Sequence, residues 1–373
     1  MKDQLESLIF HASASEGLQE FLEEELKENS CRILDKNRGG CYFKAKRDSI
    51  IEFSLKTRFT SRISVLLAEF GVRTERDLYE SIYSFPWEDL LRTEDTFKIE
   101  AESDRILKNS RYVVYKAKDA LVDRFRDKTG ERPSIEREEP DYLFLLRKRG
   151  ENVELFLSLS AKSLSHRGYR LSSEGAPIRE NMAQALLRFS GWKEGSFMLD
   201  PMCGSGTILI EAALLMKTSG YINYKRLSSS KAFLKLFGKV PKTENAAPEK
   251  PLFVGIDKNP EIIKLALENA ELAGVSDWIE FRVEDFFTVS SPDTIENSYI
   301  LSNPPYGLRL QVEDIQGFYK RFGEILKQYY RTYTVAIICG DRSLPANMRL
   351  KEEKSMKLPI SNLKGKMVQY IIL

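Results

Sequence analysis

The second half of the chain alternates short apolar runs with amphipathic stretches. Apolar runs bounded by turn residues predict strands, and apolar positions recurring every three or four residues predict helices. The predicted strands are 197–200, 253–257, 279–283, 299–302 and 335–339. The predicted helices are 208–216, 261–273 and 313–330. This alternation favours an α/β fold with a doubly wound, mainly parallel sheet.

The end of the chain carries a different pattern. Two apolar runs, 356–360 and 367–373, are separated by residues 362–366, which read Asn-Leu-Lys-Gly-Lys. Two short runs around such a polar turn predict a hairpin. The last strand is therefore expected to be antiparallel, at or near the sheet edge, and the predicted sheet has seven strands.

The first half of the chain reads as a mixed α+β region. Strands are predicted at 8–12, 41–45, 63–70 and 97–101, and helices at 16–28 and 111–126. Residues 142–146 and 153–159 flank a Gly-Glu-Asn turn and predict a further hairpin. Together with the second half, these elements lead us to expect three domains, at 1–60, 61–165 and 166–373.

Three segments between these elements have their own character. Residues 166–170, His-Arg-Gly-Tyr-Arg, are expected to form a basic linker. An amphipathic helix is predicted at 178–189. Residues 217–250 are rich in Lys and Ser, so we expect a surface insertion between the first helix and the second strand of the sheet.

Composition excludes several classes of protein. Of the 373 residues, 42% are hydrophobic, which excludes disorder for the bulk of the chain. No apolar run reaches the roughly 18 residues that cross a bilayer, and the polar, acidic start is no secretory signal. The four cysteines are scattered and only two histidines exist, so we expect no metal site, no disulfide framework and a reducing cytoplasm. Because the net charge is only +2, a nucleic-acid partner would have to meet local basic patches.

A glycine-containing loop follows the strand at 197–200 and opens the next helix. Its candidate binding residues are Asp200, Pro201, Cys203, Gly204, Gly206 and Thr207. Glycines allow a ligand to approach the backbone closely, and a helix N-terminus offers unpaired N–H groups. Such a loop can hold a dinucleotide, a phosphate or the amino-acid end of S-adenosylmethionine. The dinucleotide fingerprint fails because Leu209 stands at its third glycine, and no Gly-Lys-Ser/Thr of a P-loop is present.

Acidic residues end two further predicted strands. Asp257 closes strand 253–257, where a carboxylate can accept both hydroxyls of a ribose at the carboxyl edge of the sheet. The alternative for Asp257 is an acid beside a helix N-terminus. Asp285 follows strand 279–283 and can accept a hydrogen bond from an adenine amino group, while Phe286 can pack on the adenine ring.

The tetrapeptide Asn303, Pro304, Pro305 and Tyr306 follows the strand at 299–302. The prolines stiffen an extended backbone and remove its N–H donors. The Asn303 side-chain carbonyl and the Pro304 carbonyl can then accept both protons of one exocyclic amine, and Tyr306 can stack on the base. Accepting these protons localises the nitrogen lone pair, so attack on a sulfonium methyl needs mainly positioning and electrostatics, without a metal.

These motifs resemble the class I S-adenosylmethionine-dependent methyltransferases that act on exocyclic amines of nucleic acids. Residues 165–170 and 174–181 make the chain more specifically similar to the bacterial guanine-N2 methyltransferases of 23S ribosomal RNA. Residues 1–165 resemble the ferredoxin-like segment and THUMP RNA-binding domain of that family. Some members carry a second methyltransferase behind the first, and this chain, which stops at Leu373, is expected to be the form with one.

The resemblance implies a Rossmann-like methyltransferase domain behind a ferredoxin-like and THUMP region. It implies S-adenosylmethionine as cofactor, with loop 200–207 at the methionine part, Asp257 at the ribose, and Asp285 with Phe286 at the adenine. The loop 303–306 would hold the guanine. Pro177 and Asn181 would flank the cofactor. The implied partner is RNA, with no membrane and no obligate protein partner, docked by Arg62, Lys108, Arg111, Lys116 and 147–149.

Four alternatives remain at this stage. The nearest is guanine-N2 methylation of transfer RNA, which the stretches at 166–170 and 176–181 disfavour. An adenine-N6 methyltransferase on DNA also uses Asn-Pro-Pro-Tyr but leaves the first 160 residues unexplained. A non-catalytic RNA-binding protein predicts damaged motif residues, and none is visible. A Rossmann dehydrogenase is disfavoured by Leu209.

Overall fold

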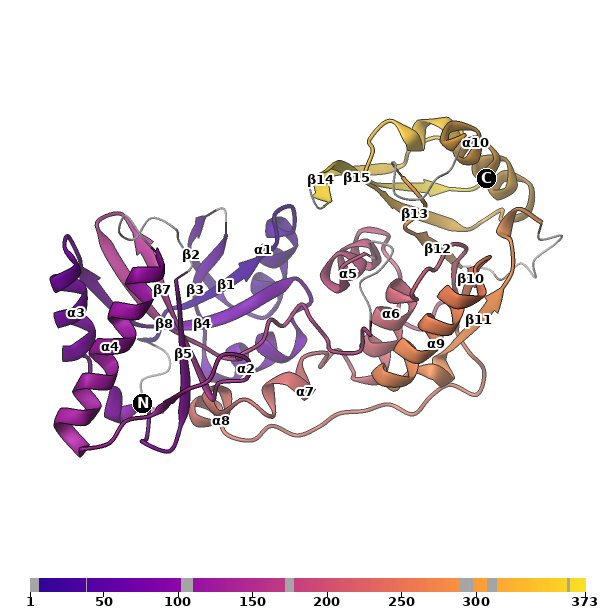
Figure 1. Ribbon diagram of the computed structural model, residues 1–373. Coiled ribbons are helices and arrows are strands. Elements are labelled where there is room, and N and C mark those ends of the chain that lie inside the picture. Colours follow the sequence, from indigo (N-terminus) through magenta and orange to yellow (C-terminus); the bar gives the residue numbers. More distant parts are fainter. Residues whose placement is uncertain are drawn as a thin grey trace.

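The computed structural model describes residues 7–37, 39–101, 110–171, 178–288, 295, 298–306, 314–360 and 363–373. Two lobes lie side by side, each built around one β-sheet (Figure 1). The N-terminal lobe contains an eight-stranded sheet and the C-terminal lobe a seven-stranded sheet. The mixed architecture predicted for the first half and the α/β architecture predicted for the second are both confirmed.

The N-terminal sheet has the strand order β2-β3-β1-β4-β8-β7-β5-β6. Its strands are β1 Phe10–Ala14, β2 Arg32–Asn37, β3 Gly40–Lys44, β4 Thr60–Gly71, β5 Thr96–Ala101, β6 Ser134–Ile135, β7 Tyr142–Arg149 and β8 Asn152–Ser158. Strand β4 pairs with β1 along its first half and with β8 along its second half. This long strand joins the two predicted N-terminal units into one sheet.

Four helices accompany this sheet: α1 Gln19–Glu28, α2 Arg47–Lys56, α3 Glu75–Ser84 and α4 Ser110–Thr129. Helix α3 begins at a capping box, in which the Thr74 side chain accepts from the Asp77 N–H and Asp77 reaches back to the Thr74 N–H. Short 3-10 helices lie at Trp87–Asp89, Ser276–Trp278, Phe286–Thr288 and Leu344–Met348.

The C-terminal sheet has the order β11-β10-β9-β12-β13-β15-β14. Its strands are β9 Met198–Asp200, β10 Phe253–Asp257, β11 Ile279–Val283, β12 Tyr299–Ser302, β13 Thr334–Cys339, β14 Lys354–Ile360 and β15 Leu363–Ile371. Neighbouring strands from β11 to β13 are parallel, and β15 is antiparallel to both β13 and β14. The predicted seven-stranded, mainly parallel sheet and its terminal hairpin are confirmed.

Helices cover both faces of this sheet. The helices on this sheet are α5 Glu180–Phe189, α6 Thr207–Lys217, α9 Pro260–Ala273 and α10 Ile315–Tyr329. Two more helices, α7 Tyr224–Leu227 and α8 Lys231–Phe237, lie between α6 and β10 in the chain. Helices α5, α6 and α9 pack on one face through side chains that include Leu186, Leu209 and Ile263. Helix α10 packs on the other face through Tyr319 and Phe322. The sheet is therefore doubly wound, as expected from the alternation of strands and helices.

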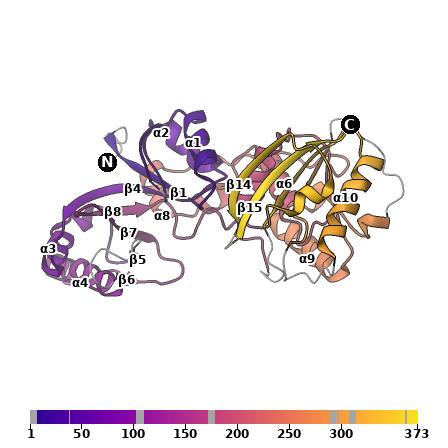
Figure 2. The same ribbon diagram turned by 90° about the horizontal axis from the view of Figure 1, so that it is seen from above.

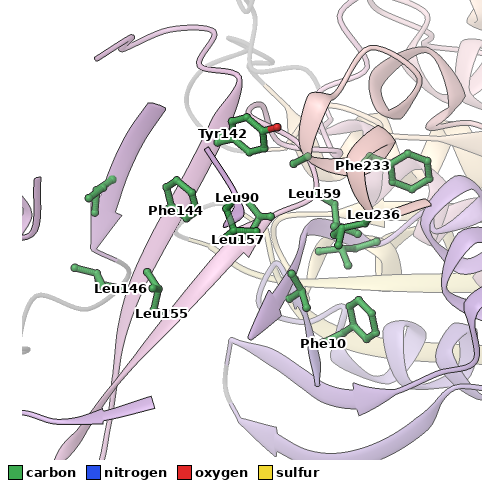
Figure 3. Close-up of a cluster of buried hydrophobic side chains, with 14 of the residues drawn as sticks. Phe10, Leu90, Tyr142, Phe144, Leu146, Leu155, Leu157, Leu159, Phe233 and Leu236 are labelled. Carbon is green, nitrogen blue, oxygen red and sulfur yellow. The ribbon is translucent and has the colours of Figure 1, made fainter. Parts of the chain in front are cut away.

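Helices α7 and α8 belong to the predicted surface insertion, but they pack against the N-terminal lobe. Figures 1 and 2 both place α8 beside the strands of that lobe. Phe233 and Leu236 of α8 are buried in one core with Phe10 of β1 and Leu159 after β8 (Figure 3). The prediction of a surface insertion was wrong for α7 and α8, because their apolar side chains pack against residues far away in the sequence, whereas residues 238–250 are mostly exposed.

The predicted basic linker is also buried in part. Arg167 donates to the side chain of Asn223 and to the backbone carbonyl of Arg58, and its guanidinium lies 3.6 Å from the Glu211 carboxylate. Tyr169 is buried and its hydroxyl donates to Glu211 over 3.0 Å. Because these side chains are enclosed and paired, the segment anchors the two lobes to each other.

Candidate functional site

The carboxyl ends of the parallel strands meet at one edge of the C-terminal sheet. In the order β11-β10-β9-β12, this edge brings together the residues that end or follow these four strands: Asp285, Asp257, Asp200 and Asn303. The chain moves from β9 outward to β11 and then returns to β12 on the other side of β9. A reversal of this kind opens a crevice in doubly wound sheets, and ligands bind there.

The loop after β9 is tightly folded against β10. The Cys203 N–H donates to the Ile256 carbonyl over 2.9 Å, and the Gly206 N–H donates to the Cys203 carbonyl over the same distance. Gly204 and Gly206 have φ of +53° and +80°, a backbone conformation that glycine adopts without strain. A Cβ at Gly206 would lie 2.8 Å from the Phe281 ring, so this turn also needs glycine for space.

Gly204 differs from Gly206 in its surroundings. A Cβ added at Gly204 would meet no atom within 4 Å, so open space lies beside this residue. The Gly204 N–H is nevertheless fixed, because it donates to the Asp257 carboxylate over 3.3 Å. A ligand can therefore approach the backbone at Gly204, and its hydroxyl or ammonium groups can donate to the neighbouring Asp257 carboxylate.

Thr207 begins α6 and is buried. Its hydroxyl accepts from the Arg170 guanidinium over 3.3 Å and lies 3.3 Å from the Ser205 hydroxyl. The Asn269 side chain donates to the Ser205 carbonyl over 3.1 Å. Arg170 and Asn269, from two other segments, therefore fix the start of this helix, and Pro201 and Cys203 of the loop before it are buried.

Asp200 is fully enclosed at the end of β9. Its carboxylate accepts from the Ser302 hydroxyl over 2.8 Å and from the Met202 N–H over 3.2 Å. Burial raises the pKa of Asp200 to about 7, although the two hydrogen bonds oppose this effect. The bond to Ser302 joins β9 to β12 across the crevice, directly before Asn303.

Asp257 is partly buried at the end of β10. One carboxylate oxygen accepts from the Gly204 N–H, and the other accepts from the Asn259 N–H over 3.0 Å. Asn259, and not Asp257, caps α9, because its side chain accepts from the Glu261 N–H. Each carboxylate oxygen can accept a second hydrogen bond, so Asp257 retains capacity for the hydroxyls of a ligand.

Asp285 and Phe286 occupy different environments. Asp285 is exposed, and its carboxylate accepts from the Phe287 N–H over 2.9 Å. The Phe286 ring is 2% exposed and packs between Phe322 and Tyr330, with a centroid distance of 5.5 Å to each. This burial argues against the predicted contact of Phe286 with an adenine ring, because the core already occupies the faces of the ring.

Asn303 carries a buried acceptor that lacks a partner among the described residues. Its Oδ1 is buried and accepts no hydrogen bond in the part of the chain that the structure describes. A buried polar atom without a partner costs roughly 1–3 kcal/mol. Such an atom at the carboxyl edge is explained if a ligand supplies the missing donor.

The residues after Asn303 are held from behind. Pro304 is buried, and the Pro305 carbonyl accepts from the Tyr319 hydroxyl over 3.2 Å. Burial raises the pKa of Tyr306, and its ring lies against Gly340, where a Cβ would be only 2.3 Å from Cε2. The absence of a side chain at 340 therefore makes room for the Tyr306 ring.

Other predicted residues are placed less directly. Pro177 lies outside the described residues. Asn181 is buried: its side-chain N–H donates to Ser15 over 3.1 Å, while its Oδ1 has no partner among the described residues.

Three predicted RNA contacts already have partners in the protein. Arg62 pairs with Glu100, the Lys116 ammonium lies over the Tyr79 ring, and Arg149 pairs with Asp35 and Glu154.

The other predicted RNA contacts differ among themselves. The Arg147 guanidinium lies over the Tyr42 and Phe156 rings, whereas Lys148 is exposed. Lys108 and the side chain of Arg111 lie outside the described residues.

Sequence reasoning missed three residues that support the site. Ser302 bonds Asp200, Tyr319 bonds the loop at Pro305, and Arg170 bonds Thr207. Ser302 and Tyr319 belong to no recognisable motif, and Arg170 lies in the stretch at 166–170, which does not reveal its hydrogen-bond partner. A hydroxyl at the end of a strand and a tyrosine within a helix are common features, so only the fold reveals their partners.

Membrane-spanning helices and metal clusters are both absent from the described residues. There, no helix is long and apolar enough to cross a bilayer, and no group of three or more His, Cys, Asp or Glu residues could hold a metal ion. The four cysteines are free and buried.

Comparison with protein families gives two matches. The family described as RMKL-like, methyltransferase domain, matches residues 167–370, more than half of the chain. The THUMP domain family matches residues 72–158.

Among curated proteins, the chain is similar to the ribosomal RNA large subunit methyltransferase K/L of Shewanella frigidimarina, with 33% identity over 364 residues. That match covers 94% of this chain and 51% of the relative, so the chain spans about half the length of the curated relatives it matches.

Two solved structures share the whole fold. One is described as a possible methylase from Clostridium difficile 630, with 27% identity, a TM-score of 0.78 and coverage of 98% of both chains. The other is a methyltransferase complexed with S-adenosylhomocysteine, with 23% identity, a TM-score of 0.79 and coverage of 98% of both chains.

Proposed function

The chain belongs to the RMKL-like methyltransferase family, and on this premise we propose that it transfers a methyl group from S-adenosylmethionine to the exocyclic N2 amine of a guanine in 23S ribosomal RNA. The similarity to ribosomal RNA large subunit methyltransferase K/L supports the substrate, and the THUMP match supports RNA as its class. The domain limits at 1–60, 61–165 and 166–373 belong to this proposal.

S-adenosylmethionine supplies a methyl group activated by a sulfonium sulfur. The loop 200–207 would hold its methionine part, next to the open space at Gly204. Asp257 would accept the ribose hydroxyls while continuing to accept from the Gly204 N–H. Asp285, exposed at the end of β11, would accept from the adenine amine, and the buried ring of Phe286 would support this loop from the core.

The unpartnered Oδ1 of Asn303 is the observation that carries the proposal. A guanine N2 amine offers two donors, and Asn303 Oδ1 together with the Pro304 carbonyl would accept them. Tyr306 would stack on the base. Tyr319 keeps the loop in place through the Pro305 carbonyl.

These contacts explain how an unreactive amine becomes a nucleophile. The lone pair of an aromatic amine is delocalised into the ring, and two acceptors on its protons draw the nitrogen toward tetrahedral geometry. Asn303 stays neutral and is not a general base. The amine proton becomes acidic only after the methyl group has arrived, and it then leaves to water, so positioning and electrostatics provide most of the rate.

Identification of the product tests the proposal. The protein is incubated with labelled S-adenosylmethionine and either undermethylated 23S RNA or transfer RNA, and each RNA is digested to nucleosides. Labelled N2-methylguanosine from 23S RNA is expected. Label in transfer RNA alone would move the substrate to that RNA, labelled N6-methyladenosine would refute the guanine assignment, and no label would contradict the proposed activity.

A further inference from the structure

The hairpin β14–β15 lies at the same edge of the sheet as Asn303. Strand β15 runs antiparallel to β13, so its first residues lie where β13 ends. Gly340, directly after β13, lies between the Tyr306 ring and the start of β15. A Cβ added at Gly340 would lie 2.3 Å from Tyr306 and 2.9 Å from Leu363. The beginning of β15 therefore lies beside the loop proposed to hold the guanine.

Three lysines share one face of this hairpin, and we name them the lysine hairpin: Lys357, Lys364 and Lys366. Lys357 and Lys366 are direct cross-strand partners, and Lys364 is paired with Pro359, two residues farther along the same face. Side chains of directly opposed residues lie on the same side of a sheet, and opposed like charges destabilise the pair. This arrangement of charge is unfavourable unless an anion is nearby.

Among the described residues, acidic side chains balance only one of these three lysine charges. Lys366 pairs with Glu352 over 2.6 Å. Lys357 and Lys364 are exposed, and neither has a side-chain hydrogen bond or ion pair within the ranges that the structure describes. Asp341, two residues after β13, already accepts from the Ser343 N–H and hydroxyl.

A fourth cation, Arg342, lies beside the lysine hairpin. The Arg342 side chain donates to the Gly365 carbonyl over 3.0 Å, which keeps its guanidinium next to the start of β15. Leu363, 48% exposed, adds an apolar surface at the tip of the hairpin, on the opposite face from the lysines.

We propose that the lysine hairpin binds the RNA backbone beside the target nucleotide, with Lys357 and Lys364 contacting phosphates; this inference rests on the proposed function. A base that enters the pocket at Asn303 and Tyr306 brings the phosphates on either side of it to this hairpin. RNA is favoured over a simple anion, because a nucleotide would use both the lysines and the adjoining Tyr306 ring, whereas a simple anion would use the lysines alone.

The test compares the K357Q/K364Q double variant with wild type. Dissociation constants for undermethylated 23S RNA are measured over a series of salt concentrations, together with KM and kcat for methyl transfer. Each phosphate contact contributes roughly 0.7–0.9 to the slope of log affinity against log salt. The double variant should lose about 1.4–1.8 from this slope if both lysines contact phosphates, and its KM for RNA should rise several-fold while kcat changes little.

Two matched variants complete the test. K357R/K364R keeps the charges and should keep the slope. K193Q removes an exposed lysine before β9, at the opposite edge of the sheet, and should behave like wild type. A double variant with the slope and KM of K193Q would overturn the inference. Wild type that binds RNA without methylating it would instead refute the proposed function, while the slope would still decide the role of the lysines.

Discussion

Asp200 ends β9, Asn303 follows the neighbouring strand β12, and both carry buried oxygens, yet among the described residues only Asp200 has donors. The Ser302 hydroxyl satisfies Asp200 and at the same time fixes the strand end that precedes Asn303. Asp200 therefore receives two hydrogen bonds and supports the frame, while Asn303 keeps an acceptor for a ligand. This difference separates the structural polar residues of the site from the proposed binding residues.

Replacing Asp200 by Asn should change how stability depends on pH. Burial raises the pKa of Asp200 from 3.8 to about 7, so its contribution to stability is fully present below the unfolded pKa and is lost as pH rises toward the folded pKa. Asn stays neutral, so D200N should be more stable than wild type at about pH 8, by up to a few kcal/mol, with the difference shrinking toward about pH 4. Thermal unfolding followed by circular dichroism measures this difference.

The exposed Asp285 provides the control for this experiment. D285N removes an aspartate at the same edge of the sheet without changing a buried carboxyl. A stability difference for D200N that stays constant from about pH 4 to about pH 8 would contradict the cause given for the raised pKa.

Replacing Asp257 by Ala should weaken cofactor binding. The variant loses a charged acceptor for the ribose and also leaves the Gly204 N–H without its partner. Hydrogen bonds to charged groups contribute about 1.5–3 kcal/mol, which corresponds to a roughly tenfold to hundredfold loss of affinity. Calorimetric titration with S-adenosylhomocysteine measures this loss.

Asp257→Asn keeps an oxygen that can accept from Gly204, so its affinity should lie between those of wild type and D257A. D277A is the matched control, because Asp277 is exposed just before β11, at the opposite edge. Equal affinities for D257A and D277A would show that Asp257 takes no part in binding.

At the scale of elements, periodicity predicted the strands and helices that form the C-terminal sheet and its two helical layers. It missed β2, which is mostly exposed and carries charged residues in place of an alternating pattern. It missed α2, whose apolar positions are too few to stand out among its charged residues. The packing of α8 was invisible, because a core shared with β1 depends on contacts between residues more than 200 positions apart.

The candidate site likewise has residues that the sequence predicted and contacts that only the fold shows. Motifs predicted that Asp200, Asp257 and Asn303 would meet, because parallel strands place their carboxyl ends together. The burial of Phe286 and the hydrogen bond from Tyr319 could not be predicted, since both depend on how α10 crosses the sheet. Local sequence patterns contain no information on that crossing.

Replacing Phe233 of α8 by Ala should destabilise the protein strongly. The ring is fully buried against the N-terminal lobe, and removing such a side chain typically costs about 3–5 kcal/mol. Urea unfolding should show a lower midpoint than in K225A, a control at an exposed position of α7. An F233A midpoint equal to that of K225A would mean that α8 does not hold the lobes together.

At the scale of the whole molecule, buried polar contacts fix the two lobes relative to each other. The Asn223 side chain donates to the carbonyls of Ser54 and Thr57 and accepts from Arg167. Arg188 of α5 pairs with Glu24 and Glu28 of α1 at a more exposed position. These contacts would give an RNA that docks on the N-terminal lobe, as proposed above, a defined position relative to the carboxyl edge of the C-terminal sheet.

The central claim is that Asn303 holds the amine that receives the methyl group. The measurement that tests it most directly is the single-turnover rate of methyl transfer to 23S RNA by N303A at saturating cofactor, together with calorimetric cofactor affinity. We predict that the rate falls by at least about a hundredfold, the scale of losing one oriented polar contact in a transition state, while cofactor affinity and melting temperature stay close to wild type. A rate near that of wild type would contradict the account.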